Sequence, residues 1–253
     1  MERQRVKTVP LRIAFDMDGV LADMDWALAE RARILFGPGV EETIAETPDA
    51  PETEAPAEDA PQAPGEGSLP ATRLRLTGRQ QRRLWRDVRR IDGFWESLRE
   101  IEPGSVARLA TLAETHQWEV IFLTRRPATA GFTVQRQTQR WLAERGFTMP
   151  SVYVVQGLRG RIAAALDLDV VVDDRPENCL DVVLESNALA TLIWRDSQVA
   201  VPTGTKRLGI AVMPTVAACL DMVERLSTDD GDPPGLVDRV KRLLGLKPDI
   251  ART

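Results

Sequence analysis

Residues 11–23 read LRIAFDMDGVLAD, and this stretch decides the fold. It begins as an apolar run interrupted only by Arg12, which is typical of a strand buried on both faces. Similar runs follow at residues 120–124, 152–155, 169–173 and 189–194. Helical patterns occupy residues 103–115, 132–145, 157–166, 176–187 and 214–226. This alternation predicts an α/β fold, a doubly wound, Rossmann-like parallel sheet with right-handed crossovers.

A long insertion separates the first two predicted strands, where a crossover needs only about a dozen residues. Amphipathic stretches at 25–36 and 77–92 predict a small helical cap inserted after the first strand. Between them, residues 38–70 hold seven of the 17 prolines and no Lys or Arg, which predicts a disordered acidic loop. The expected domains are a core at 1–24 and 101–226, a cap at 25–100, and a linker with an amphipathic helix at 227–253.

Composition excludes several classes of protein. Two cysteines and one histidine cannot form a disulfide framework or an imidazole- or thiolate-rich metal site. No apolar stretch approaches the roughly 20 residues that cross a bilayer, and no signal peptide is evident, so we expect a cytoplasmic protein with no membrane partner. Residues 73–90 contain eight arginines, whose helical spacing predicts a solvated helix face, so nucleic acid is not the expected partner.

Acidic residues gather where predicted strands end. Ligands of doubly wound sheets bind outside the carboxyl ends of the strands. That rule selects Asp16 and Asp18 after the first strand, Thr124 after the second, and Asp173 and Asp174 after the fourth. Four carboxylates in one crevice repel each other unless a cation lies among them, and Mg²⁺ prefers oxygen ligands. Because Mg²⁺ also favours phosphate, we expect a small phosphorylated substrate.

Three motifs carry a resemblance to a known family. They are FDMDGVLAD at 15–23, LTRRP at 123–127 and VVVDDRPEN at 170–178, and they resemble motifs of the haloacid dehalogenase superfamily of phosphohydrolases. With FWESL at 94–98 and EPGSVARLATLA at 102–113, the arrangement resembles the 5′(3′)-deoxyribonucleotidase (cytosolic type C 5′-nucleotidase) branch, over about residues 11–225. The resemblance implies a Mg²⁺-dependent phosphomonoesterase that hydrolyses (deoxy)ribonucleoside monophosphates through an aspartyl-phosphate.

The same resemblance implies roles for individual residues. Asp16 would be the nucleophile, and Asp18 would protonate the leaving oxygen and then deprotonate the incoming water. The Mg²⁺ ligands would be Asp16, the backbone carbonyl of Asp18, and Asp173, with Asp174 as a more distant or alternative ligand. Thr124 would donate its hydroxyl group to a phosphoryl oxygen.

The sequence departs from the family pattern at the third motif. A lysine normally precedes the fourth strand, but residues 157–169 contain none. Arg159 or Arg161 would replace it, Arg159 having the expected spacing, and Lys206 is a weaker substitute. Arginine binds phosphate as a fork and is not equivalent to an ammonium group. Arg125 is a further candidate phosphate ligand, although Arg125, Arg126 and Arg175 are individually more typical of surface or salt-bridge arginines.

Two other functions remain open. The chain could be a phosphatase of another small phosphorylated metabolite or of a nucleic-acid end. It could instead be a catalytically weak binding or regulatory module, which the missing lysine favours and the retained carboxylates oppose. Aromatic residues of the predicted cap could stack on a nucleobase, but packing is the commoner fate of such side chains. These residues are Trp26, Phe36, Trp85, Phe94 and Trp95.

Overall fold

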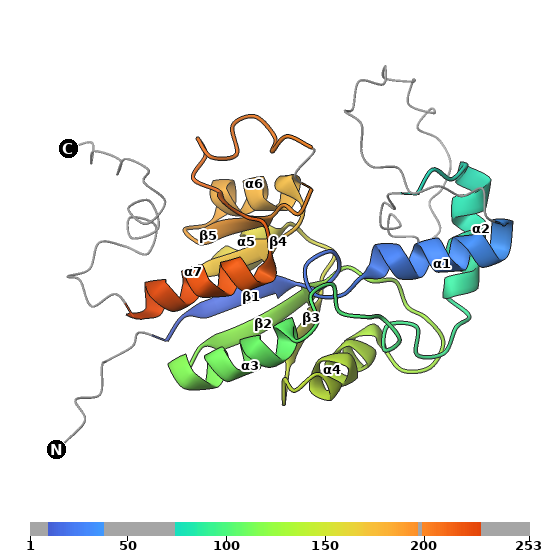
Figure 1. Cartoon of the computed structure of the whole chain (residues 1–253), viewed down its shortest axis with the longest axis horizontal. Helices are drawn as coiled ribbons and strands as arrows, with labels where there is room; N and C mark the ends of the chain where they lie inside the picture. The colour runs from blue at the N-terminus through green and yellow to red at the C-terminus, as the bar shows by residue number, and fades with distance from the viewer. Residues whose placement is uncertain (1–9, 38–73, 197–198, 229–253) are drawn as a thin grey trace.

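The computed structural model describes residues 10–37, 74–196 and 199–228. Six parallel strands form one sheet in the order β3-β2-β1-β4-β5-β6, with helices on both faces (Figure 1). This confirms the predicted doubly wound, Rossmann-like α/β class. The strands are β1 (Arg12–Asp16), β2 (Glu119–Thr124), β3 (Ser151–Val154), β4 (Val170–Asp173), β5 (Leu189–Ile193) and β6 (Ala211–Met213).

Two separate cores hold the helices to the sheet, because alternate residues of each strand face opposite sides. Ile13 and Phe15 of β1 pack in one core, and Ala14 between them packs in the other. The first core packs against one set of helices and also includes residues of the insertion, and the second core packs against the helices on the other face. The first set is α3 (Ser105–His116), α4 (Val134–Glu144) and α7 (Val216–Thr228), and the second is α5 (Arg159–Ala165) and α6 (Pro176–Glu185).

Both edges of the sheet differ from the expectation. The third run was predicted to be buried on both faces, but Tyr153 is 46% exposed and Val154 39% exposed, because β3 is an edge strand. The other edge strand, β6, was not predicted. It has three residues, too few for a periodic pattern to stand out from the preceding loop.

Helices α1 (Met24–Phe36) and α2 (Gly78–Val88) belong to the insertion and lie together beyond the carboxyl ends of the strands (Figure 1). Arg31 of α1 forms an ion pair with Asp87 of α2. The whole of the predicted loop at 38–70 and the predicted helix of the tail lie outside the described residues. Within the described ranges, none of the helices is long and apolar enough to cross a bilayer.

The two ends of the insertion are fastened to each other. Ala22 pairs with Glu100 in an antiparallel bridge. The Asp23 amide donates to the Arg99 carbonyl over 3.0 Å, and the Ile101 amide donates to the Leu21 carbonyl over 2.9 Å. The insertion therefore leaves and rejoins the core next to the loop that follows β1.

Candidate functional site

The sheet register brings the predicted site residues to one level. Asp16 is paired with Leu123 of β2, so Thr124 lies one residue further along that strand. Phe15 is paired with Val172 of β4, so Asp173 lies level with Asp16. The ends of three adjacent strands, β2, β1 and β4, thus place Thr124, Asp16 and Asp173 side by side at the carboxyl edge.

The loop after β1 turns Asp18 away from Asp16. The chain makes a wide turn in which the amides of Leu21 and Ala22 both donate to the Met17 carbonyl, over 3.0 and 2.8 Å. Gly19 has a φ of 84°, a conformation that favours glycine. The Asp18 amide donates to Asp16 Oδ2 over 3.1 Å. The Asp18 backbone is therefore hydrogen-bonded to the Asp16 carboxylate, whereas the Asp18 carboxylate contacts other residues.

Arg159 lies between Asp16 and Asp173. Its Nη2 group donates to Asp16 Oδ1, and its Nε lies 3.5 Å from Asp173 Oδ2. Nε is buried, and its ion pair with Asp173 is too long for a good hydrogen bond. Arg159 is the first residue of α5. This helix lies so close to α6 that a Cβ at Gly160 would collide with the Asp181 backbone. Arg159, the residue expected to replace the lysine, thus contacts both carboxylates.

Asp18 forms a second cluster with Arg126 and Thr124. Arg126 Nη2 donates to Asp18 Oδ1 over 2.7 Å, and Nε lies 3.0 and 2.9 Å from the two carboxylate oxygens. The Thr124 hydroxyl group donates to Asp18 Oδ2 over 3.2 Å. The carboxylate of Asp18 is thus held on the β2 side of the edge.

Asp173 and Asp174 complete the edge on the side of β4. Asp173 accepts hydrogen bonds from Asn178 Nδ2 at 3.0 and 2.9 Å and from the Arg175 amide at 2.9 Å. The Asp174 carboxylate lies against the loop after β1, so close to Gly19 that a Cβ at that position would collide with it. The left-handed backbone at position 19 favours glycine, and a side chain there would also displace the Asp174 carboxylate.

Charge and burial oppose each other at this edge. Burial raises the pKa of Asp16 well above its ordinary value, Arg159 offsets part of this rise, and Asp173, Asp174 and Asp18 add to it by repulsion. Burial also raises the pKa of Asp173, against Arg159 and the Asn178 hydrogen bonds. The pKa of Arg159 is raised because the two carboxylates outweigh its own burial. The crevice is one in which a further cation would be stabilised.

The residues present fit Mg²⁺ by their chemistry. Every candidate ligand is an oxygen donor. The buried carboxylates of Asp16 and Asp173 share a single guanidinium group, that of Arg159. Over the described ranges no three acidic, imidazole or thiol groups already surround a common point. The predicted set, with two carboxylates and the Asp18 carbonyl, does not require such a group.

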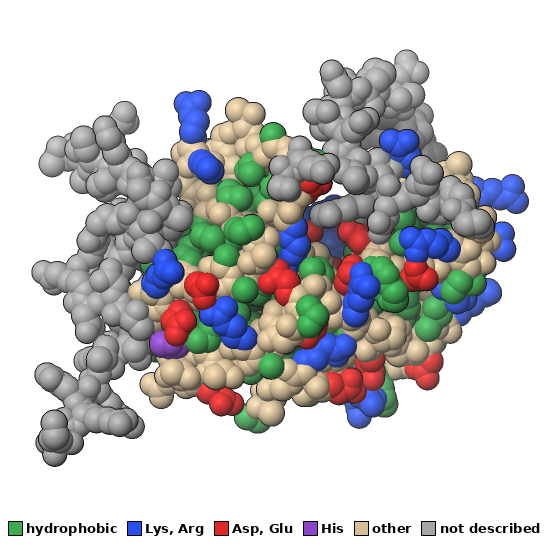
Figure 2. All heavy atoms as spheres, in the orientation of Figure 1, with side chains coloured by type: hydrophobic (Ala, Val, Ile, Leu, Met, Phe, Trp, Pro, Cys, Tyr) green, Lys and Arg blue, Asp and Glu red, His purple; other side chains and the backbone are tan. Residues whose placement is uncertain are grey.

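Other predicted residues lie apart from this cluster. Arg125 and Arg161, the other two candidate phosphate ligands, have exposed side chains, and Lys206 is exposed in the segment between β5 and β6. Trp85, Phe94 and Trp95 are buried, which leaves Trp26, 39% exposed, as the most accessible of the five aromatic residues. In Figure 2, acidic and basic side chains surround a hollow between the sheet and the α1–α2 pair.

Sequence reasoning underrated two groups. Arg126 was interpreted as a surface or salt-bridge arginine, and it is a salt-bridge arginine that is 2% exposed and bound to a site carboxylate. Arg195 was not considered, although it donates to the Gly19 and Val20 carbonyls over 2.6 and 3.0 Å and pairs with Glu102. Their local patterns look like ordinary charged loops, so only the three-dimensional contacts identify them.

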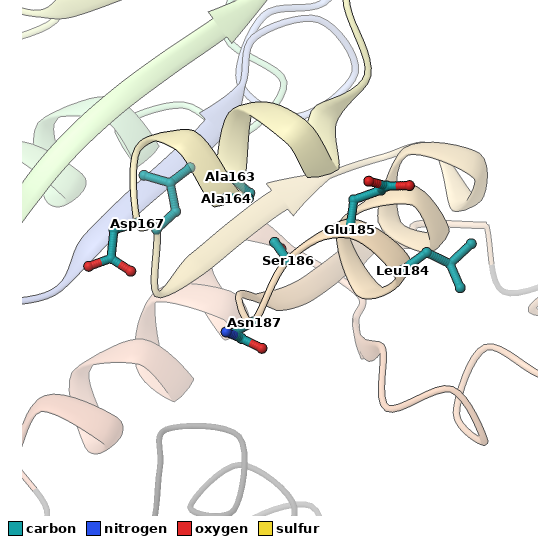
Figure 3. A pocket seen from close by; sticks show the side chains of 8 residues that line it. Ala163, Ala164, Asp167, Leu184, Glu185, Ser186 and Asn187 are labelled. Atoms are coloured by element: carbon teal, nitrogen blue, oxygen red, sulfur yellow. The ribbon is translucent and has the colours of Figure 1, made fainter.

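A separate pocket of about 340 Å³ lies at the opposite edge of the sheet (Figure 3). It is formed where α5 leads into β4 and α6 leads into β5, and its lining includes Asp167, Glu185 and Asn187. None of the predicted site residues contributes to it. The site is therefore assigned from its chemistry and from the topology of the sheet.

No protein-family model matches the chain, and no curated protein matches it either.

Proposed function

We propose that the protein is a Mg²⁺-dependent phosphomonoesterase of the haloacid dehalogenase superfamily, acting on (deoxy)ribonucleoside monophosphates in the cytoplasm. The observation that carries the proposal is the convergence of Asp16, Thr124, Arg159 and Asp173 at the carboxyl edge of the sheet. Asp16, Thr124 and Asp173 belong to the three sequence motifs, and Arg159 is the residue expected to replace the missing lysine. Both cysteines are free buried thiols, which suits a reducing compartment.

In the first step, a carboxylate oxygen of Asp16 attacks phosphorus and the bond from phosphorus to the ester oxygen breaks. The leaving oxygen takes a proton from Asp18, which gives the free nucleoside and an aspartyl-phosphate. The Arg159 guanidinium group contacts both Asp16 and Asp173, and would bind the phosphoryl oxygens as they gain charge.

In the second step, water attacks the phosphorus atom and gives a proton to Asp18. The bond between phosphorus and Asp16 breaks, which releases phosphate and restores the carboxylate. Asp18 can serve in both steps because the proton that it takes from water restores its acid form.

When bound, Mg²⁺ would neutralise charge on the phosphoryl group. Asp16, the carbonyl of Asp18 and Asp173 would hold it, with Asp174 near the same loop. Asn178 and the Arg175 amide fix the Asp173 carboxylate, so this ligand is oriented before any ion binds.

The nucleotide preference rests on the resemblance to the deoxyribonucleotidase branch. Trp26 offers the accessible aromatic surface for a base, and Arg99 lies 4.1 Å from the centre of its ring. Arg99 is itself held by an ion pair with Asp23, the residue that caps α1. An aromatic ring beside the loop that carries Asp18 is suited to bind a substrate larger than phosphate.

The test is a screen for phosphate release by the full-length chain. Nucleoside 5′- and 3′-monophosphates and sugar phosphates are compared with Mg²⁺ and with excess chelator. The proposal predicts Mg²⁺-dependent release that is fastest with nucleotides. Faster release from sugar phosphates would refute the substrate class, and no release from any of them would refute the enzyme.

A second candidate is a phosphate-binding module with little turnover. The observation in its favour is the Arg159 guanidinium group on Asp16, because that contact occupies one oxygen of the expected nucleophile. Such a module would bind nucleoside monophosphates in calorimetry without releasing phosphate. Turnover above background in the same preparation would eliminate it.

A further inference from the structure

Arg126 occupies a place that no role in the proposed reaction requires. Its side chain is fully buried although it carries a permanent charge, and such burial is costly unless the charge is paired and hydrogen-bonded. Each of its three nitrogens makes a hydrogen bond: Nε and Nη2 bind Asp18, and Nη1 donates to the Thr138 hydroxyl group over 2.9 Å. A fork of this kind fixes the orientation of a carboxylate as well as its position.

We propose that Arg126 is a positioning residue that holds Asp18 apart from Asp16 and Asp173 and directs it to the leaving group. The inference rests on the proposed function. Asp16 and Asp173 both contact Arg159, whereas Asp18 contacts Arg126 and Thr124. Arg159 thus holds the two carboxylates that would act on the phosphate and the cation. Arg126 holds the third, which would carry the proton.

Trp95, near the end of the insertion, packs against Arg126. The guanidinium carbon lies 4.8 Å from the ring centre of Trp95, which is fully buried. Trp95 is fixed in turn, because its Nε1 donates to the Pro127 carbonyl over 3.1 Å and its amide donates to Gln137 Oε1 over 3.1 Å. The orientation of Asp18 is therefore connected to the end of the insertion through one aromatic ring and one arginine.

The kinetic test uses two leaving groups. A nucleoside leaves as an alkoxide and needs a proton, whereas p-nitrophenolate leaves readily without one. Because water attack in the second step also uses Asp18, the rate measured is that of leaving-group release in a single turnover. If Arg126 positions the proton donor, Arg126→Met lowers this rate about 100-fold for a nucleoside monophosphate and far less for p-nitrophenyl phosphate. Asp18→Asn shows the same selective loss, Arg126→Met adds little to it in the double variant, and Arg126→Lys restores part of the rate.

Arg136→Met is the matched control. Arg136 also lies over an aromatic ring, 4.1 Å from the centre of Phe132, but its side chain is exposed on α4. We expect this variant to keep the wild-type ratio of the two rates. Equal losses for both substrates in Arg126→Met, or losses that multiply in the double variant, would overturn the inference.

Crystal structures provide a readout that does not depend on turnover. In wild type the Asp18 carboxylate should lie on Arg126, and in Arg126→Met it should leave this position. An unmoved Asp18 would overturn the positioning role even if the enzyme is active. If wild type hydrolyses neither substrate, the proposed function fails, and the movement of Asp18 still decides the role of Arg126.

Discussion

Arg159 and Asp16 form a buried ion pair at the carboxyl edge of the sheet, although 143 residues separate them in the chain. The pair exists because β1 lies next to β4, and α5 leads directly into β4. Asp173, the last residue of β4, lies on the other side of the same guanidinium group. The consequences of this arrangement can be measured.

Replacing Arg159 tests whether a fork or only a charge is needed. Arg159→Met should lower kcat by about 100-fold, the usual cost of one transition-state donor. Arg159→Lys should retain more activity, because an ammonium group supplies the charge without the fork. Arg108→Met, which removes an ion pair between α3 and α7, is the control and should keep the wild-type rate. A fully active Arg159→Met would show that Arg159 does not assist the reaction.

Mg²⁺ should raise the thermal stability of the protein, because it would relieve repulsion between buried carboxylates. An ion at 100 times its Kd stabilises by about 2.7 kcal/mol, which is roughly 5–10 °C in Tm for a domain of this size. Asp173→Asn should lose most of this shift. Asp221→Asn, on the surface of α7, should keep it. A shift of equal size in both variants would place the ion elsewhere.

The ion pair between α1 and α2 should make stability depend on pH. The side-chain hydrogen bond from Arg31 lowers the pKa of Asp87. A carboxyl group with a lowered pKa in the folded state stabilises above its unfolded pKa and loses that effect as the pH falls through the folded value. Asp87→Asn should therefore cost about 1 kcal/mol at neutral pH and almost nothing in strong acid, measured by urea unfolding. Glu30→Gln, which affects the more exposed pair with Arg33, should cost less, and a cost of Asp87→Asn that persists in acid would contradict this account.

Deleting residues 41–68 should leave the rate of hydrolysis unchanged. The insertion is fastened at Ala22 and Glu100, and α1 and α2 contact each other through Arg31 and Asp87, all outside the deleted stretch. The measurement is kcat together with the yield of soluble protein. A collapse of either would show that the acidic segment is part of the folded cap.

The sequence predicts the central strands and the residues at their ends, because buried parallel strands leave long apolar runs that end in polar residues. Asp16, Thr124 and Asp173 follow from that pattern alone. The edge strand β6 does not, since three residues carry no detectable period. The two faces of β3 also escape prediction, because an edge strand can be apolar and still exposed.

The second part of the site depends on long-range contacts. In the sequence, Arg126 is one of two consecutive arginines, and nothing local distinguishes the exposed Arg125 from its buried neighbour. The difference arises from Asp18, Thr138 and Trp95, which the fold brings together from separate segments. Arg159 could be predicted only because the resemblance supplied an expected spacing.

The most direct test is phosphate release from nucleoside monophosphates by wild type and by Asp16→Asn, each with Mg²⁺ and each confirmed as folded by circular dichroism. The account predicts Mg²⁺-dependent turnover in wild type and none above background in the variant, because the attacking carboxylate has been replaced by an uncharged amide. Substantial hydrolysis by a folded Asp16→Asn protein would contradict the assignment of Asp16 as the nucleophile.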